Sequence, residues 1–165
     1  MANKMFHGTN FKSGLDIGRS GFMFSPVDVF LKNINLEYPT EEEFKAILRI
    51  DGLDENISRE DYAYEFTSRY FSPKQHIDGI YFSPEFSVSY TDISSVKKER
   101  PGMVFEFDKE VLMNNSVRFI GLGYVVYRRL SLEFLQQLHL YKCGPSEIEQ
   151  TEKVFRIYLC QINVL

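Results

Sequence analysis

The sequence predicts a single α+β domain over residues 1–165, with two packed, antiparallel-rich sheets in a split β-sandwich and flanking helices. Two observations lead to this prediction. Helix-start signals concentrate in the first half of the chain, whereas short β-prone runs dominate the second half. The 165 residues also contain no internal repeat, low-complexity tract or linker-like segment that would mark a domain boundary.

The first half is expected to begin with a strand and continue mainly as helices. Residues 4–9 form a short run that ends in a glycine turn, which predicts a strand. A short amphipathic helix should follow and end near Gly21. Thr40 and Glu43 have the spacing of a capping box, which predicts a helix over 41–50.

Later segments combine a further helix signal at Ser58 with several β-prone runs. Apolar runs rich in β-branched and aromatic residues predict strands over 79–82, 103–107, 117–120, 124–127 and 153–165. Ser83 and Pro84 provide a helix start, so a short helix should extend to about residue 92. Leucines three residues apart predict another helix over 131–140.

Composition limits the partners that the chain is expected to have. The formal net charge is −4, so general attraction to nucleic acid or to an anionic membrane is not expected, and no apolar run could span a bilayer. The N-terminus lacks the features of a secretory signal, which predicts a cytoplasmic protein or one delivered into a target cell's cytosol. We expect reduced thiols at Cys143 and Cys160 and no metal site, because no Cys and His cluster has zinc-ligand spacing.

Three short motifs carry residues suited to chemistry. The first is Phe6-His7-Gly8-Thr9, followed by Ser20-Gly21-Phe22. The second is Gly79-Ile80-Tyr81-Phe82-Ser83, followed by Ser87-x-x-Tyr90. The third is Gln150-Thr151-Glu152, an acidic segment that opens the last predicted strand.

In this order the motifs resemble those of the ADP-ribosyltransferase superfamily. The resemblance is to the class that is marked by His, Tyr and Glu, which includes diphtheria toxin and the poly(ADP-ribose) polymerases. The resemblance implies that NAD is a substrate, and the absence of a Gly-rich phosphate loop argues against a Rossmann fold. Gly8 has no Cβ, so its backbone can approach the planar nicotinamide carboxamide and hold it by paired hydrogen bonds. By resemblance, Ser87 completes this contact, and Tyr81 and Tyr90 stack on the nicotinamide ring.

The resemblance also implies which residues take part in catalysis. His7, assisted by Thr9, would bond a ribose hydroxyl of NAD. Glu152 would stabilise the oxocarbenium-like ribose, a charge that develops in the transition state. His7, Tyr90 and Glu152 are therefore the predicted catalytic residues, with the acid expected at the start of a strand in the central sheet.

A second alignment of the third motif stays open at this point. The segment Gly123-Tyr124-Val125-Val126-Tyr127 resembles the polymerase segment Glu-Tyr-Ile/Val-Val-Tyr, with Gly123 in the place of the acid. In that alignment the chain lacks a catalytic acid of its own. Glu147 and Glu149 are the remaining candidates for the acid.

The expected function is ADP-ribosylation of a protein acceptor, as a mono-ADP-ribosylating effector or toxin that uses NAD and no metal. Nucleic acid and membranes are not expected as partners. Two alternatives remain: a catalytically inactive module that binds NAD or ADP-ribose, and an NAD glycohydrolase that passes ADP-ribose to water. The presence of an acid in the pocket would separate the enzymes from the module.

Overall fold

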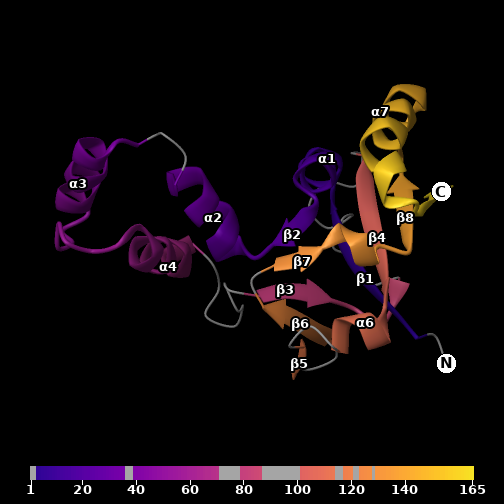
Figure 1. The fold of residues 1–165 in the computed structure, drawn as a ribbon, viewed down its shortest axis with the longest axis horizontal. Helices are drawn as coiled ribbons and strands as arrows, with labels where there is room; N and C mark the ends of the chain where they lie inside the picture. Colours follow the sequence, from indigo (N-terminus) through magenta and orange to yellow (C-terminus); the bar gives the residue numbers. More distant parts are fainter. Residues whose placement is uncertain are drawn as a thin grey trace. The chain divides into compact units, whose positions relative to one another are not determined.

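The computed structural model of the chain describes residues 3–35, 39–70, 79–86, 101–113, 117–120, 123–127 and 129–165. The chain divides into two compact units. We call Met1–Met23 together with Ile80–Leu165 the sheet unit, and Phe24–Gly79 the helical unit. The elements of both are labelled in Figure 1. In the part of the chain that the structure describes, no helix is both long enough and apolar enough to cross a membrane.

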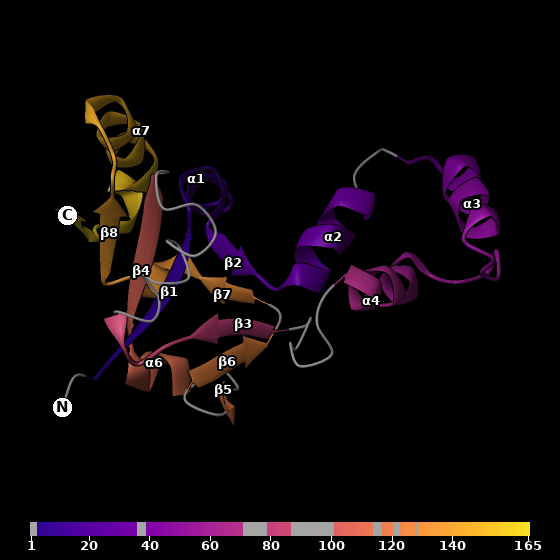
Figure 2. The same ribbon diagram turned by 180° about the vertical axis from the view of Figure 1, so that it is seen from behind.

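Hydrogen bonds group the described strands into three sheets. A four-stranded sheet has the order β1 (Lys4–Asn10), β4 (Gly102–Asp108), β8 (Gln137–Tyr141) and β9 (Gln161–Val164). Its pairs are antiparallel except β8–β9, which is parallel, and Figure 2 shows β1 beside β4. A second sheet has the order β3 (Gly79–Phe82), β6 (Gly123–Tyr127) and β5 (Val117–Ile120), and β2 (Phe22–Phe24) pairs with β7 (Arg129–Ser131). The α+β class is confirmed, whereas the two-sheet sandwich stays a prediction.

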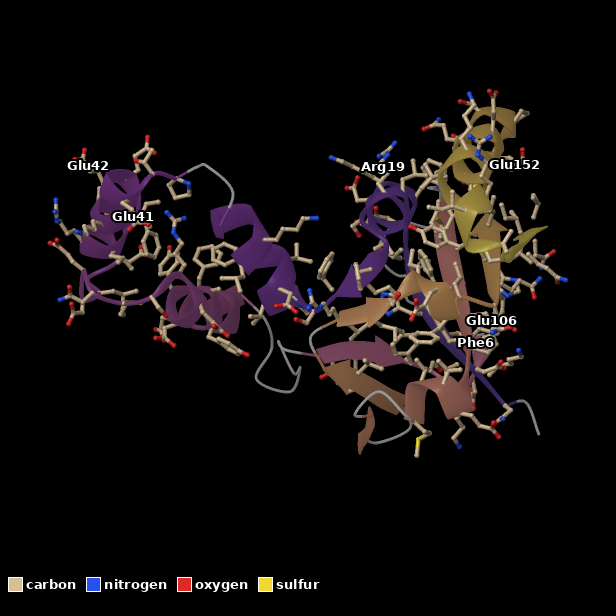
Figure 3. All side chains as sticks on the ribbon, in the orientation of Figure 1. Phe6, Arg19, Glu41, Glu42, Glu106 and Glu152 are labelled. Atoms are coloured by element: carbon tan, nitrogen blue, oxygen red, sulfur yellow. The ribbon has the colours of Figure 1, made fainter. Side chains whose placement is uncertain are left out.

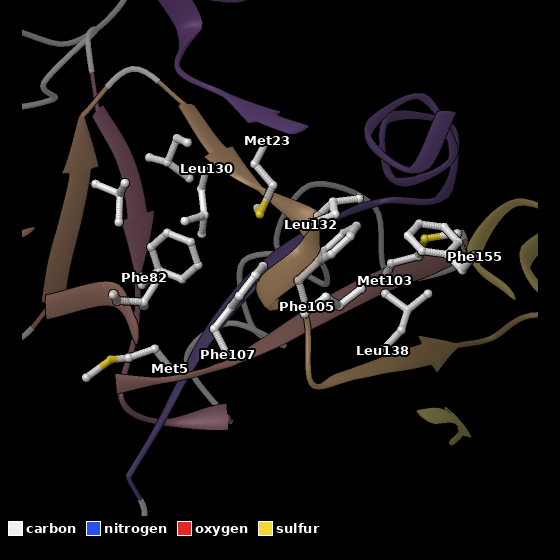
Figure 4. Packing of buried hydrophobic residues seen from close by; sticks show 14 of the residues in the cluster. Met5, Met23, Phe82, Met103, Phe105, Phe107, Leu130, Leu132, Leu138 and Phe155 are labelled. Carbon is white, nitrogen blue, oxygen red and sulfur yellow. The ribbon is translucent and has the colours of Figure 1, made fainter. Parts of the chain in front are cut away.

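The core of the sheet unit lies on one face of the four-stranded sheet. Alternate residues of β1 and β4, including Met5, Phe105 and Phe107, are buried there, as period-2 alternation requires. Figure 4 shows these side chains converging with Met23 of β2 and Leu130 of β7. This core holds the three sheets in one unit.

The described part of the sheet unit also contains three helices, and capping residues explain where α1 begins and ends. These helices are α1 (Phe11–Ser20), α6 (Lys109–Met113) and α7 (Pro145–Phe155), with short 3-10 turns at η1 (Leu132–Phe134) and η2 (Arg156–Tyr158). Asn10 caps α1 by accepting a hydrogen bond from the Ser13 N–H at 2.9 Å. Gly21 ends α1 with a φ of 79°, a conformation that favours glycine.

The helical unit contains α2 (Pro26–Asn35), α3 (Glu41–Ile50) and α4 (Arg59–Tyr70). The capping box of Thr40 and Glu43 is present, which confirms the helix predicted over 41–50. Its small core includes stacked rings of Phe30 and Phe66, whose centroids lie 4.2 Å apart. The unit therefore has an apolar cluster of its own.

The helix predicted over residues 131–140 is wrong. The structure has a short turn at η1, and β8 follows from Gln137. Leu132 and Leu138 are both fully buried, but they come from two different elements that face one core. A three-residue spacing of leucines therefore reflected a shared core and not a helical face.

The strand predicted over residues 153–165 is also wrong in its first part. Residues up to Phe155 belong to α7, and only Gln161–Val164 form a strand. Pro145 occupies the first turn, and the Gly144 N–H donates to Glu147 Oε2 at 3.0 Å. These start signals, together with a buried face that includes Thr151 and Phe155, outweigh the β-branched composition.

Candidate functional site

The candidate site lies where β1 and β3 separate. The two strands meet at one antiparallel bridge between Phe6 and Ser83. The Phe6 N–H donates to the Ser83 carbonyl at 2.8 Å, and the Ser83 N–H donates back at 2.9 Å. In a continuous antiparallel ladder, the next reciprocal pair would join Gly8 and Tyr81.

The ring of His7 occupies the position of that next pair. Its Nδ1 lies 2.7 Å from the backbone carbonyl oxygen of Tyr81. Because a carbonyl oxygen only accepts hydrogen bonds, Nδ1 must carry the proton and donate it. The neutral ring therefore has Nε2 as its acceptor atom, which is the form suited to a hydroxyl donor.

The backbone N–H and C=O of Gly8 consequently point away from β4, on a side where none of the described strands pairs with them. In an antiparallel strand, the N–H and C=O of one residue point to the same side, and the side alternates along the strand. Phe6 directs both groups toward Ser83, so Gly8 directs its own toward the same edge. Among the residues that the structure describes, no hydrogen bond is made to these two groups of Gly8. A donor and an acceptor are thus presented side by side.

Tyr81 borders this edge with an outward side chain. It is 37% exposed, while its neighbours Ile80 and Phe82 are buried in the core on the other face of β3. Thr9 is partly exposed on β1. The split between β1 and β3 is therefore bordered by four of the predicted site residues: His7, Gly8 and Thr9 on β1, and Tyr81 on β3.

The segment that follows β3 begins with a fixed turn. The Glu85 N–H donates to Ser83 Oγ at 3.0 Å. Phe86 then packs edge-on against Phe6, with centroids 5.3 Å apart. The predicted site residues Ser87 and Tyr90 lie outside the described residues, so their placement stays a prediction.

The placement expected for Glu152 is wrong. Glu152 does not open a strand: it lies in α7 with an exposed side chain, next to an ion pair of Glu149 and Lys153 at 2.9 Å. Figure 3 shows it on α7, well apart from Phe6 of β1. The physical reason is the helix start at Gly144–Pro145, which carries all three acids of this segment into one helix.

Gly123, the alternative position for the acid, begins β6. This strand is the neighbour of β3 in the three-stranded sheet. The glycine therefore belongs to the strand beside the one that carries Tyr81. The alignment that puts the acid position at Gly123 therefore falls on a strand, whereas the alignment that uses Glu152 falls on a helix.

One buried polar network escaped the sequence analysis. His139 Nε2 lies 2.7 Å from Glu106 Oε2, and Asn163 Nδ2 lies 3.1 Å from His139 Nδ1. Glu106 and His139 are both only 8% exposed, and Lys4 Nζ lies 3.5 Å from the other Glu106 oxygen. An acid inside the apolar run 103–107 was the signal that could have revealed this network. It joins β4, β8 and β9 on the sheet face opposite the core.

The two thiols are unsuited to nucleophilic chemistry near neutral pH. Both cysteines are free. Burial, with a smaller contribution from the Glu147 charge, raises the pKa of Cys143 to about 11. Burial also raises the pKa of Cys160. Among the described residues, no group of three or more His, Cys, Asp or Glu side chains could hold a metal ion.

Comparison with known proteins identifies likeness in fold. No protein-family model matches the sequence, and no curated protein matches it. The structure is similar to that of Thermus sp. 2.9 DarT in complex with NAD+, with a TM-score of 0.53, 9% identity, and coverage of 99% of this chain and 95% of that one. It is also similar to the same protein in complex with ADP-ribosylated ssDNA, with a TM-score of 0.51, 10% identity, and coverage of 99% and 94%.

The second of these structures corrects the expected partner. The sequence predicts a protein acceptor and no nucleic acid, but this protein of similar fold is bound to ADP-ribosylated ssDNA. The exclusion rested on a net charge of −4 averaged over the whole chain. That charge is segregated: the helical unit has 12 acidic and 6 basic residues, whereas the sheet unit has 11 acidic and 13 basic residues. The unit that contains the candidate site is therefore net positive.

Proposed function

We propose that the chain binds NAD+ at the split between β1 and β3 and transfers ADP-ribose to single-stranded DNA. The observation that carries the proposal is the outward-facing N–H and C=O of Gly8, beside the His7 ring. A carboxamide has one acceptor oxygen and one donor nitrogen, so it complements such a pair on a strand edge. The fold likeness to DarT with NAD+ and with ADP-ribosylated ssDNA supports both the donor and the acceptor.

In this proposal the residues of the split have separate roles. Gly8 holds the nicotinamide carboxamide, and Tyr81, with Tyr90 as predicted, stacks on the ring. Ser87 completes the carboxamide contact. Nε2 of His7 accepts a hydrogen bond from a ribose hydroxyl, because Nδ1 is committed to the Tyr81 carbonyl. Thr9 assists at the ribose.

The reaction exchanges one bond at the anomeric carbon for another. The glycosidic bond to nicotinamide breaks, and nicotinamide leaves with the bonding electron pair. A nucleophilic atom of the DNA acceptor forms the new bond and releases its proton to water. Fixed positions of donor and acceptor would lower the barrier by orientation, which contributes strongly in such displacements.

A non-catalytic NAD+-binding module is the second candidate function. Two observations favour it: Glu152 lies in α7, and Gly123 occupies the strand beside β3. A site with no carboxylate near the ribose would bind NAD+ but would lack an electrostatic contribution that commonly reaches about a hundredfold in rate.

The test is incubation of the purified chain with NAD+ and a set of ssDNA oligonucleotides that each lack one base. Intact-mass spectrometry reads ADP-ribose on DNA, and nicotinamide release is measured in parallel. We expect a mass increase of one ADP-ribose on ssDNA. Nicotinamide release without modified DNA would indicate a glycohydrolase, and NAD+ binding without either product would indicate the module; both outcomes contradict the proposal.

A further inference from the structure

The outer face of the β2–β7 ribbon carries an aromatic ring and a cation in contact. On the inner face, Met23 and Leu130 are each only 1% exposed and belong to the core. The alternate residue Phe22 is 37% exposed, and Arg129 is exposed beside it. The Arg129 guanidinium lies 5.6 Å from the centroid of the Phe22 ring.

The backbone under this pair is held in place by several hydrogen bonds. The Gly21 N–H donates to the Ile17 carbonyl at 3.0 Å as α1 ends. Ser20 Oγ accepts from the Phe22 N–H at 3.3 Å and donates to its carbonyl at 2.9 Å. The Leu132 N–H donates to the Gly21 carbonyl at 2.9 Å, which ties the end of β7 to the start of β2. The ring and the cation therefore project from a rigid base.

The charge of Arg129 is not neutralised by a carboxylate within the described part of the chain. By contrast, Arg19, which precedes the same ribbon, pairs with Asp16 at 3.4 Å. In the sequence, Arg129 is directly preceded by a second basic residue, Arg128. Arginine over an aromatic ring combines a stacking surface with donors for phosphate oxygens.

From this arrangement we infer that the outer face of the β2–β7 ribbon is a platform that stacks an unpaired base of the ssDNA acceptor on Phe22 and contacts its phosphate through Arg129. The inference rests on the proposed function, because it names a contact for the proposed acceptor. Bases stack on aromatic rings and on guanidinium planes in single-stranded nucleic acid, and the backbone phosphate supplies the complementary charge. Duplex DNA, whose bases are already stacked, should bind the platform poorly.

The test is fluorescence anisotropy of a labelled mixed-sequence ssDNA, measured without NAD+. Phe22→Ala should weaken binding by on the order of tenfold, the scale of losing one base–aromatic stack, whereas Phe22→Tyr should retain it. Arg129→Ala should weaken binding more than Arg156→Ala, a matched change at another exposed arginine of the sheet unit. Thermal unfolding of each variant controls for folding.

Three outcomes would overturn the inference. Unchanged ssDNA affinity in Phe22→Ala would show that Phe22 does not stack a base. Transfer of ADP-ribose to DNA by the wild type would be unaffected by this result, so the proposed function would survive. If a separate calorimetric titration of Phe22→Ala shows weaker NAD+ binding while ssDNA affinity is unchanged, the ring contacts the adenine of NAD+ and not the DNA acceptor. Failure of the wild type to bind ssDNA at all would overturn both this inference and the proposed acceptor.

Discussion

The ring of His7 donates a hydrogen bond to the backbone carbonyl of Tyr81, with Nδ1 and the oxygen 2.7 Å apart. A side chain of β1 thus takes the acceptor that a backbone N–H of β1 would reach in a continuous sheet. The consequence is a local split, beyond the bridge of Phe6 and Ser83, at which Gly8 presents its backbone outward. The proposed binding of NAD+ depends on this relationship.

Proline at Gly8 and proline at Thr9 should have different effects, because the N–H groups of these two residues point to opposite sides of β1. Gly8→Pro removes an N–H that points out of the sheet, so it should abolish NAD+ binding at moderate cost to stability. Thr9→Pro removes an N–H that points toward β4 and leaves its ladder acceptor unpaired, so it should destabilise the fold more, by about 1–3 kcal/mol. Calorimetric titration with NAD+ and thermal unfolding measure the two effects. Equal destabilisation with NAD+ binding retained in Gly8→Pro would contradict the assigned backbone direction.

Substitution of the exposed acid on α7 should have little effect. Glu152→Gln keeps the size of the side chain and removes its charge at a position in α7 that lies away from the split. We expect the rate of ADP-ribose transfer to change less than twofold, whereas a catalytic glutamate would cost about a hundredfold or more. Single-turnover rates with ssDNA measure the difference. A hundredfold loss with unchanged NAD+ affinity would restore Glu152 as the catalytic acid.

The Glu106–His139 pair should contribute to stability more than any exposed ion pair of the chain. Glu106→Ala leaves the Nε2–H of the buried His139 ring without its acceptor, which should cost about 1–3 kcal/mol in the free energy of unfolding. Glu149→Ala breaks the exposed pair with Lys153 and should cost less than about 1 kcal/mol. Urea denaturation measures both. Similar losses for the two variants would mean that the network in the sheet adds nothing beyond a surface contact.

Local signals in the sequence predicted the elements whose determinants are local. The capping box of Thr40 and Glu43 predicted α3 with its observed bounds, because both partners lie within one turn. The strands β1 and β3 were likewise predicted from short runs. Pro145 is also a local signal for the start of α7, but the β-branched and aromatic residues after Lys153 favour a strand, so the sequence predicts the wrong element there.

Features that depend on distant segments could not be predicted in the same way. The hydrogen bond between His7 and Tyr81 joins residues 74 positions apart, and no periodicity reports on it. Glu106 and His139 come from two strands whose pairing was unknown, so neither showed its partner in the sequence. The charge segregation required the boundary of the helical unit, which only the contacts of the folded chain define.

The most direct measurement of the central claim is the amide resonance of Gly8 in ¹⁵N-labelled protein during titration with NAD+. The account predicts a saturable downfield proton shift at Gly8, because its N–H gains an acceptor, and a smaller shift at Thr9, whose N–H points toward β4. Nicotinamide alone should shift the same resonance in the same direction. If NAD+ shifts other amide resonances in a saturable way while the Gly8 resonance does not move, binding at the split between β1 and β3 is contradicted.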